Sequence, residues 1–133
     1  MEAKNVSINH LGKDILGHSR AVKTGSYIHV SGTTAVDEQG KVVGLGDPYT
    51  QTKQILKNIE SALNVVGASL EDVVRTRVYV TNIDRWQSID KAHSEVFANI
   101  HPATSLVEIS RLISPGMLVE IEADAILDRS SQK

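Results

Sequence analysis

Carboxylate side chains recur at alternate positions near the end of the chain, at Glu120, Glu122 and Asp124. On a strand, alternate residues share one face and lie about 6.8 Å apart. Carboxylates are the ligands that hard cations such as Ca²⁺ and Mg²⁺ prefer. Strand spacing sets these three groups too far apart to surround one ion, so the row does not predict a metal site.

Basic side chains alternate in the same way on an earlier stretch, at Arg75 and Arg77. If the two stretches face the same way, the arginines are counter-charges for the acidic row. That row is then either the solvated outer face of an antiparallel sheet or a seam between subunits, and the pattern leaves both interpretations open. The other, covered face of the arginine strand is predicted to hold Val74, Thr76, Val78 and Val80.

The usual ligands of transition metals form no binding motif. The chain has no cysteine, which excludes a thiolate nucleophile, a disulfide and a Cys-bound zinc. Its five histidines include no HxH or HxxxH pair, so no metal is expected. His93 is predicted to fill the buried stripe of a helix, and His18, just ahead of Ser19 and Arg20, is a candidate proton relay.

Two helices are predicted. Asp47 and Pro48 indicate the start of the first, as N-cap and first helical residue, and Gly67 indicates its end. Asn82 or Asp84 caps the second, which ends before Pro102. The apolar stripes are Ile55, Leu56, Ile59, Ala62, Leu63 and Val66 on the first helix, and Trp86, Ile89, His93, Val96, Phe97 and Ile100 on the second.

Strands are predicted at residue 22 and at residues 27–31, 73–81, 105–110 and 117–127. With the helices this gives the order β-β-α-β-α-β-β, an α+β fold with a mixed sheet and both helices on one face. The apolar side of the last strand, opposite its acidic row, fits under those helices. A length of 133 residues predicts a single domain, residues 1–133.

Composition excludes several classes of function. The net charge is −2, whereas nucleic-acid binders usually carry a basic surplus, so nucleic acid is not expected as the partner. No apolar run approaches the ~18 residues of a membrane-spanning helix. The first residues also lack the apolar core of a signal peptide, and we expect a soluble cytoplasmic protein.

Residues 101–109 read His-Pro-Ala-Thr-Ser-Leu-Val-Glu-Ile, and residues 118–123 read Leu-Val-Glu-Ile-Glu-Ala. This combination closely resembles the Rid family (YjgF-like, reactive-intermediate deaminases). The family signature is Pro-Ala-Arg-Ser, a short apolar strand with Val-Glu, and then an apolar-Glu-Ile-Glu-Ala strand. Further matches lie at residues 30–32, 58–59, 62–63, 67–68 and 73–76, so the resemblance covers nearly the whole chain in the right order.

The resemblance implies a chorismate-mutase-like α+β fold and a homotrimer with three clefts between neighbouring subunits. The acidic face of the last strand would look into the trimer and its clefts. Members with the full signature hydrolyse small imines and enamines, such as 2-aminoacrylate and 2-iminopropanoate, to keto acids and ammonia. The resemblance implies no metal and no organic cofactor.

Imine hydrolysis needs an anchor for the substrate carboxylate, a proton relay and a positioned water. In the family the anchor is the arginine of Pro-Ala-Arg-Ser, and here that position is Thr104. A threonine hydroxyl can hydrogen-bond a carboxylate but brings no charge, and charge-assisted bonds are roughly twice as strong. The chain therefore resembles a divergent member whose substrate is altered.

Three positions match the family's site. Glu120 matches the carboxylate that orients the attacking water, and a base there would need its pKa raised by burial, Glu122 and Glu108. The alternative for Glu120 is a surface carboxylate paired with Arg77. Ser31 and Gly32 match the cleft wall, with a tight strand end as the alternative. The backbone amides near Leu106 are expected to donate further hydrogen bonds to the substrate.

Two further positions depart from the family. Asp84 stands where the family has an asparagine before the second helix. Residues 17–20 read Gly-His-Ser-Arg where the family has Gly-Pro-Tyr. We therefore expect Arg20 to replace the missing arginine as a cation for an acidic ligand beside Thr104. The alternative is a surface arginine or one paired with the acidic face.

Three functions compete. The first is a hydrolase of small imines or enamines. The second is a non-catalytic trimer that binds small carboxylates as a sensor or regulator, which Thr104 in place of arginine favours. The third, endoribonuclease, is a label attached to some relatives. The chain has only one Phe and one Trp, which argues against it, because RNA bases stack on aromatic side chains.

Overall fold

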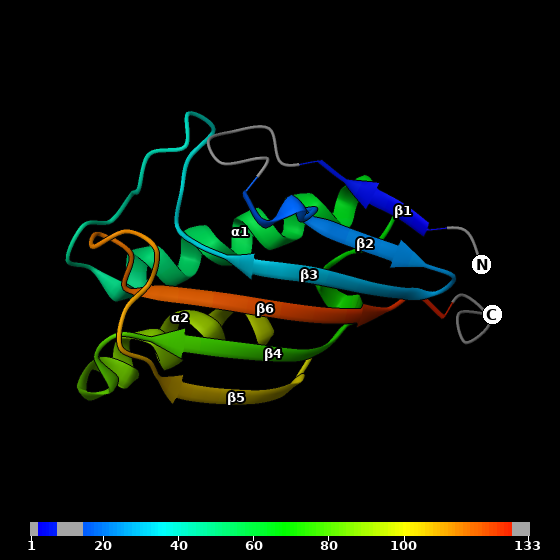
Figure 1. The fold of residues 1–133 in the computed structure, drawn as a ribbon. Coiled ribbons are helices and arrows are strands. Elements are labelled where there is room, and N and C mark those ends of the chain that lie inside the picture. Colours follow the sequence, from blue (N-terminus) through cyan, green and yellow to red (C-terminus); the bar gives the residue numbers. More distant parts are fainter. Residues whose placement is uncertain (1–2, 8–14, 129–133) are drawn as a thin grey trace.

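The computed structural model describes residues 3–7 and 15–128. Within these residues, six strands form one sheet in the order β1-β2-β3-β6-β4-β5, and both α-helices cover one of its faces (Figure 1). The strands are β1 (Ala3–Val6), β2 (Ala21–Thr24), β3 (Tyr27–Thr33), β4 (Val73–Val80), β5 (Ala103–Glu108) and β6 (Val119–Ile126). The helices are α1 (Pro48–Val65) and α2 (Trp86–Phe97), with short 3₁₀ turns η1 (Ile15–Gly17), η2 (Leu70–Asp72) and η3 (Ile83–Arg85).

The sheet is mixed, as predicted. β4 and β5 run parallel, and every other neighbouring pair is antiparallel. The predicted order of elements was wrong at its start, where it lacked β1. β1 pairs with β2 through its backbone, and of its side chains only Val6 is buried, so it carries no apolar alternation. β5 also begins at Ala103, two residues before the predicted strand.

Helix α1 forms as its sequence predicts. The Asp47 carboxylate accepts a hydrogen bond from the Thr50 amide at 3.2 Å, and Pro48 occupies the first turn. Gly67 adopts a φ of 83°, a left-handed conformation that favours glycine and lets the chain leave the helix. The predicted apolar face is buried against the sheet.

A buried glutamine on α1 fixes two loops at one end of the sheet. The Gln51 amide nitrogen donates to the Gly44 and Gly116 carbonyls at 3.2 and 2.8 Å, and its oxygen accepts from the Leu118 amide at 2.9 Å. The loop after β3 and the loop before β6 therefore lie together at this end (Figure 1). Glu120 follows directly, so α1 positions the start of the acidic strand.

Helix α2 differs from its prediction at its first turn. Asn82 accepts from the Asp84 amide at 3.0 Å and so caps η3, and α2 begins four residues later at Trp86. The Trp86 side chain is 46% exposed, so placing it in the buried stripe was wrong. Phe97 is buried, and the His93 ring packs against it with centroids 4.6 Å apart.

The covered face of the sheet holds the core. On β6, Val119, Ile121 and Ala123 are fully buried, which confirms the predicted apolar side of this strand. The prediction for Val74 was wrong, since it is 43% exposed. The register of β4 against β6 shifts between Val73 and Arg75, so Val73 takes the buried position instead.

No helix among the described residues is both long enough and apolar enough to cross a membrane.

Candidate functional site

A β-bulge in β3 places Gly32 beside Glu120. Val30 pairs with Ala123 and Thr33 with Ile121, so the two residues Ser31 and Gly32 stand opposite the single residue between those partners. A bulge of this kind re-aims the strand and its side chains. A β-carbon at residue 32 would lie 2.6 Å from Cδ of Glu120 and 2.7 Å from its Oε2. The missing side chain of Gly32 is therefore the space that the Glu120 carboxylate occupies.

Two causes raise the pKa of Glu120. Burial is the larger, because it disfavours the charged form, and the nearby negative charge of Glu122 adds to it. The expectation that Glu108 also raises the pKa of Glu120 was wrong. Leu106 and Glu108 share the helix side of β5, and the Glu108 carboxylate accepts from the Ile83 amide at 3.0 Å. Glu120 is thus a half-buried carboxylate with a raised pKa, as a general base near neutral pH requires.

Ser31 fastens the segment before β2 to the bulge. Its hydroxyl donates to the Ser19 carbonyl at 2.6 Å, and its amide donates to the Arg20 carbonyl at 2.9 Å. The Arg20 amide in turn donates to the Val6 carbonyl at 2.9 Å. The Arg20 side chain is half-buried, and this burial lowers its pKa. The structure therefore brings Arg20, Ser31, Gly32 and Glu120 to one place.

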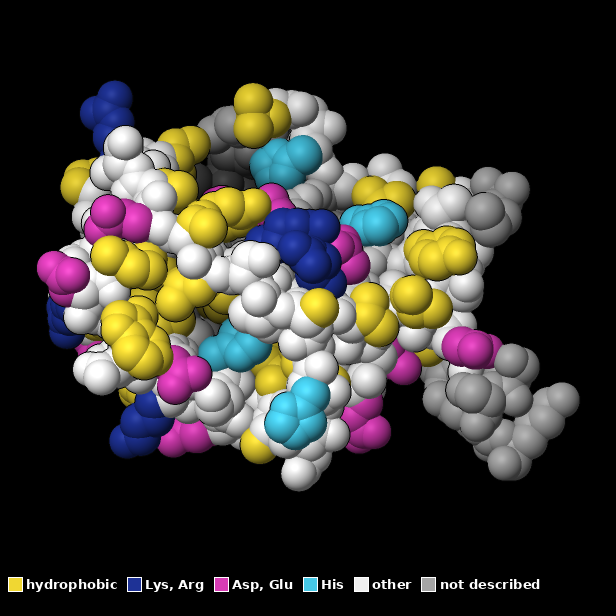
Figure 2. Space-filling view, turned by 90° about the horizontal axis from the view of Figure 1, so that it is seen from below, with side chains coloured by type: hydrophobic (Ala, Val, Ile, Leu, Met, Phe, Trp, Pro, Cys, Tyr) yellow, Lys and Arg dark blue, Asp and Glu magenta, His cyan; other side chains and the backbone are white. Residues whose placement is uncertain are grey.

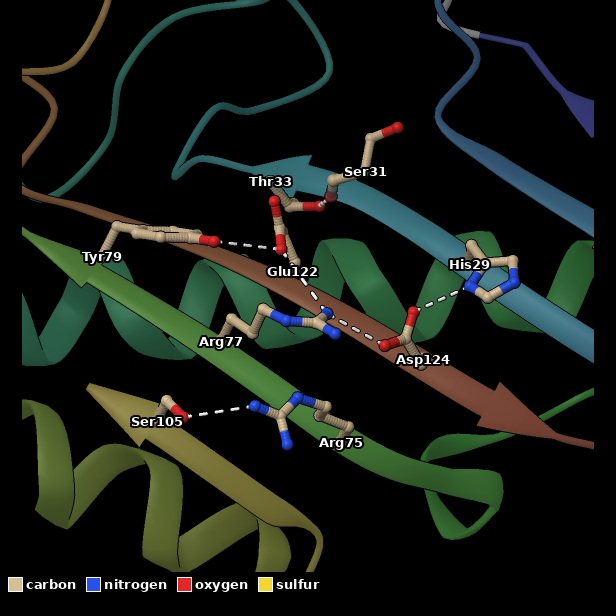
Figure 3. Close-up of polar contacts among 9 residues, drawn as sticks. All are labelled: His29, Ser31, Thr33, Arg75, Arg77, Tyr79, Ser105, Glu122 and Asp124. Carbon is tan, nitrogen blue, oxygen red and sulfur yellow. Dashed lines mark hydrogen bonds and ion pairs between the residues drawn. The ribbon is translucent and has the colours of Figure 1, made fainter. Parts of the chain in front are cut away.

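The face of the sheet opposite the two helices, called the open face below, also carries an ion-pair network (Figure 3). Asp124 accepts from His29 Nδ1 at 2.8 Å and from Arg77 at 2.9 Å, and the Arg77 guanidinium also lies 3.6 Å from Glu122. The Tyr79 hydroxyl donates to Glu122 at 3.2 Å. Arg77 thus forms its ion pairs with the two later carboxylates of the row.

These contacts shift the pKa values of the network. Burial acts to raise the pKa of Asp124, but the hydrogen bonds from His29 and Arg77 outweigh it and bring the pKa below its usual range. The hydrogen bond to Asp124 raises the pKa of Arg77. Seen from below, basic and acidic side chains adjoin in the middle of the surface with hydrophobic side chains around them (Figure 2). The network holds its charges in place and leaves Glu120 as the carboxylate with the raised pKa.

Thr104 and Leu106 lie on the opposite side of the sheet from the acidic row. Thr104 pairs with Thr76 in the parallel register of β5 and β4, and the two hydroxyl oxygens are 2.8 Å apart. The Thr76 hydroxyl also lies 2.9 Å from Nε2 of His93 on α2. Leu106 packs against the core. Both β5 side chains therefore face the helices.

Within one chain, Thr104 is far from Glu120. Glu120 pairs with Tyr79 on β4, and Tyr79 pairs with Val107 on β5. Two strand spacings and three residues along β5 separate the two positions by roughly 14 Å. Asp84 lies elsewhere again, in η3 next to the carboxyl end of β5. One chain therefore does not bring together all of the residues that the sequence predicted.

Sequence reasoning placed His93 in the helix stripe but missed its link to Thr104. That link depends on the register between two parallel strands joined by a helix. A histidine and two threonines at residues 93, 76 and 104 give no local signal of it, because their contact is long-range.

Comparison with known proteins decides the family. The family model described as Endoribonuclease L-PSP matches residues 12–127. The chain belongs to this family. A RutC family protein of Pyrococcus abyssi is 37% identical over 113 residues, which cover 85% of this chain and 88% of that protein.

Solved structures agree with this assignment. Rv2704 of Mycobacterium tuberculosis, described as a member of the YjgF/YER057c/UK114 family, is 44% identical with a TM-score of 0.85, covering 95% of this chain and 100% of that one. YyfA of Yersinia pestis, described as a protein of unknown function of the conserved Rid family, is 30% identical with a TM-score of 0.84 and the same coverage. The predicted family and its chorismate-mutase-like α+β fold are confirmed.

Proposed function

We propose that this chain is a small-molecule hydrolase of the Rid type, which converts reactive imines and enamines related to 2-aminoacrylate into keto acids and ammonia. The observation that carries the proposal is the Glu120 carboxylate, half-buried over Gly32 with a raised pKa. A group with these properties can take a proton from water at neutral pH and later return it. No metal or organic cofactor enters the proposed reaction.

The reaction balances around Glu120. The carboxylate accepts a proton from water while the water oxygen bonds to the carbon of the protonated imine, and the C=N π electrons move to nitrogen, which gives a neutral tetrahedral carbinolamine. The Glu120 carboxyl group then returns this proton to the nitrogen, which becomes an ammonium leaving group. As the C–N bond breaks and ammonia leaves, the hydroxyl proton of the intermediate passes to the Glu120 carboxylate and the carbon becomes the carbonyl of a keto acid. An enamine enters the same route after tautomerisation to the imine.

Arg20 is the proposed anchor for the substrate carboxylate. Its backbone is fixed to Ser31 and Val6, which places residue 20 at the same bulge as Glu120. A guanidinium binds a carboxylate through two parallel hydrogen bonds and adds a full positive charge. Burial lowers the pKa of the half-buried Arg20, and a bound carboxylate would oppose this shift because an opposite charge favours the charged form. Ser31 and Gly32 form the wall between anchor and base.

A homotrimer is the proposed assembly. The sheet has helices on one face only, and on the other face Tyr27, Val107 and Ile126 are 52%, 45% and 39% exposed. Apolar side chains on a sheet face favour a covering partner. A second copy would also supply Thr104 and the Leu106 amide opposite Glu120, which one chain cannot do. Asp84 lies in η3, whose Ile83 amide donates to Glu108 at the other end of β5 from Thr104, so we assign it no role in this arrangement.

The test of the proposed reaction generates the imine in place. An amino-acid oxidase releases 2-iminopropanoate from alanine, and the appearance of pyruvate is followed with and without this protein. Faster pyruvate release, abolished in Glu120→Gln, supports the hydrolase. An unchanged rate with an intact, folded protein overturns it.

A non-catalytic binder of small carboxylates is the second candidate. The hydroxyl of Thr104 is tied into internal hydrogen bonds and brings no charge to the position of the family's arginine. Thermal stabilisation by pyruvate without any acceleration of imine hydrolysis would favour this binder over the enzyme. We do not propose ribonuclease activity, because the net charge is −2 and aromatic side chains for base stacking are scarce.

A further inference from the structure

Three side chains form a hydrogen-bonded row from helix α2 to the edge strand β5. His93 Nε2 lies 2.9 Å from the Thr76 hydroxyl oxygen, and that oxygen lies 2.8 Å from the hydroxyl of Thr104. Thr76 is fully buried, whereas Thr104 is exposed. The row therefore connects a half-buried histidine to an exposed threonine through one fully buried side chain.

The row can point in either of two directions, because each hydroxyl has one hydrogen to donate. If His93 carries hydrogen on Nε2, it donates to Thr76, Thr76 donates to Thr104, and the Thr104 hydrogen is free for another acceptor. If Nε2 is bare, Thr76 donates to His93, and Thr104 donates inward to Thr76. The hydrogen on Nε2 therefore decides whether Thr104 offers a donor or only lone pairs to its outer side.

The surroundings of His93 favour a neutral ring with a single hydrogen. Burial lowers the pKa of His93, and the charge of Asp90 on the same helix only partly opposes this. The two residues that the row joins to the ring on β4 and β5, Thr76 and Thr104, carry no charge. Contact with Phe97 limits rotation of the ring. The choice between the two directions is thus a choice between two neutral tautomers.

A carboxylate accepts hydrogen bonds and donates none. It can bind Thr104 only when the hydroxyl hydrogen points outward, and in the free protein that hydrogen has one weak alternative, the Pro102 carbonyl at 3.2 Å. An outward hydrogen requires hydrogen on Nε2 of His93. Binding at Thr104 and the tautomer of His93 are therefore linked through Thr76.

We propose that His93 is a positioning residue, which acts through Thr76 to set Thr104 as a hydrogen-bond donor to the carboxylate of a small keto or imino acid. This inference rests on the proposed function for its ligand class. Thr104 stands at the position of the missing arginine. The inference makes its hydroxyl a hydrogen-bond donor to the ligand rather than an acceptor. It also gives a role to the contact between the half-buried His93 ring and Thr76 on β4.

The test uses pyruvate as the probe and compares the wild type with Thr76→Val, Thr76→Ser and Thr104→Val. Valine keeps the shape of Thr76 and removes the hydroxyl, whereas serine keeps the hydroxyl. We expect Thr104→Val, which removes the donor, to weaken pyruvate binding, measured by calorimetry, by roughly tenfold, the effect of one hydrogen bond to a charged acceptor. We expect a similar loss in Thr76→Val, because without the Thr76 donor the Thr104 hydrogen is no longer held outward and can bond to the Pro102 carbonyl instead. Thr76→Ser should bind pyruvate as the wild type does.

The spectroscopic arm follows the ring nitrogens of His93 by ¹⁵N NMR. We expect Nε2 to carry the hydrogen in the pyruvate complex of the wild type and of Thr76→Ser. A pyruvate complex with a bare Nε2, binding that is unchanged in Thr76→Val, or the absence of any pyruvate binding overturns the inference. If pyruvate binds with the expected Nε2 signature but imine hydrolysis is not accelerated, the proposed reaction fails while the positioning role stands.

Discussion

The Glu120 carboxylate lies in the space that a side chain at Gly32 would fill. A β-carbon at residue 32 would be 2.6 Å from Cδ of Glu120. The nearest atoms belong to the end of a flexible side chain, so Glu120 can move away at small cost. Gly32 also has no left-handed φ, so alanine meets no backbone strain there. The contact therefore constrains the position of the carboxylate rather than the fold.

Gly32→Ala is expected to impair imine hydrolysis at least tenfold while changing the free energy of unfolding by less than about 1 kcal/mol, because a displaced base loses its geometry. Pyruvate release and urea denaturation measure the two effects. Gly116→Ala is the matched control, since its β-carbon would meet Cδ2 of Leu45 at 2.9 Å, an exposed and flexible side chain. Full activity in Gly32→Ala would show that the position of Glu120 does not matter.

The raised pKa of Glu120 predicts opposite pH dependences for rate and stability. As a base, Glu120 acts in its charged form, so the rate should rise with pH through the raised folded-state pKa. Stability behaves inversely: with a folded pKa above the unfolded one, the contribution of Glu120 is fully present below the unfolded pKa and is lost as pH rises through the folded pKa.

Glu120→Gln separates these effects, because glutamine resembles the protonated acid at every pH. We expect this variant to lose the rising limb of the rate profile and to be more stable than the wild type at pH 7, measured by thermal unfolding at pH 4 and pH 7. Asp124→Asn serves as the contrasting variant. The pKa of Asp124 is lowered, so its contribution to stability is present at pH 7 and is lost as pH falls. Equal pH profiles for Glu120→Gln and the wild type would contradict the role of Glu120.

The parts of the fold with a regular local pattern could be predicted from the sequence. The apolar faces of α1 and β6 follow the helix and strand periods, so their burial was foreseen. Val74 was placed wrongly because a bulge moved Val73 into its position, and the sequence carries no sign of that shift. The side of the sheet on which the Thr104 hydroxyl lies was equally hidden, because it depends on the parallel register of β4 and β5.

Arg20→Ala tests the proposed anchor. Removing a charge-assisted contact to a carboxylate should weaken pyruvate binding by roughly tenfold to a hundredfold. Arg20→Lys should restore part of this loss, because lysine keeps the charge but not the forked geometry of the guanidinium. Calorimetry measures the affinities, with Arg111→Ala, in the exposed loop before β6, as the control for net charge. Unchanged pyruvate affinity in Arg20→Ala would exclude it as the anchor.

Val107→Lys tests the proposed trimer. Val107 lies on β5 with its side chain on the open face of the sheet, and it is 45% exposed in the single chain. In a trimer that covers this face, a lysine there would bury a charge, which is costly without a partner. We expect the wild type to sediment at three times the mass of one chain and Val107→Lys to dissociate. Val65→Lys is the matched control, because Val65 is 57% exposed at the end of α1 on the helix side, where a positive charge is tolerated. A monomeric wild type would contradict the trimer and, with it, a site completed by Thr104 of a second copy.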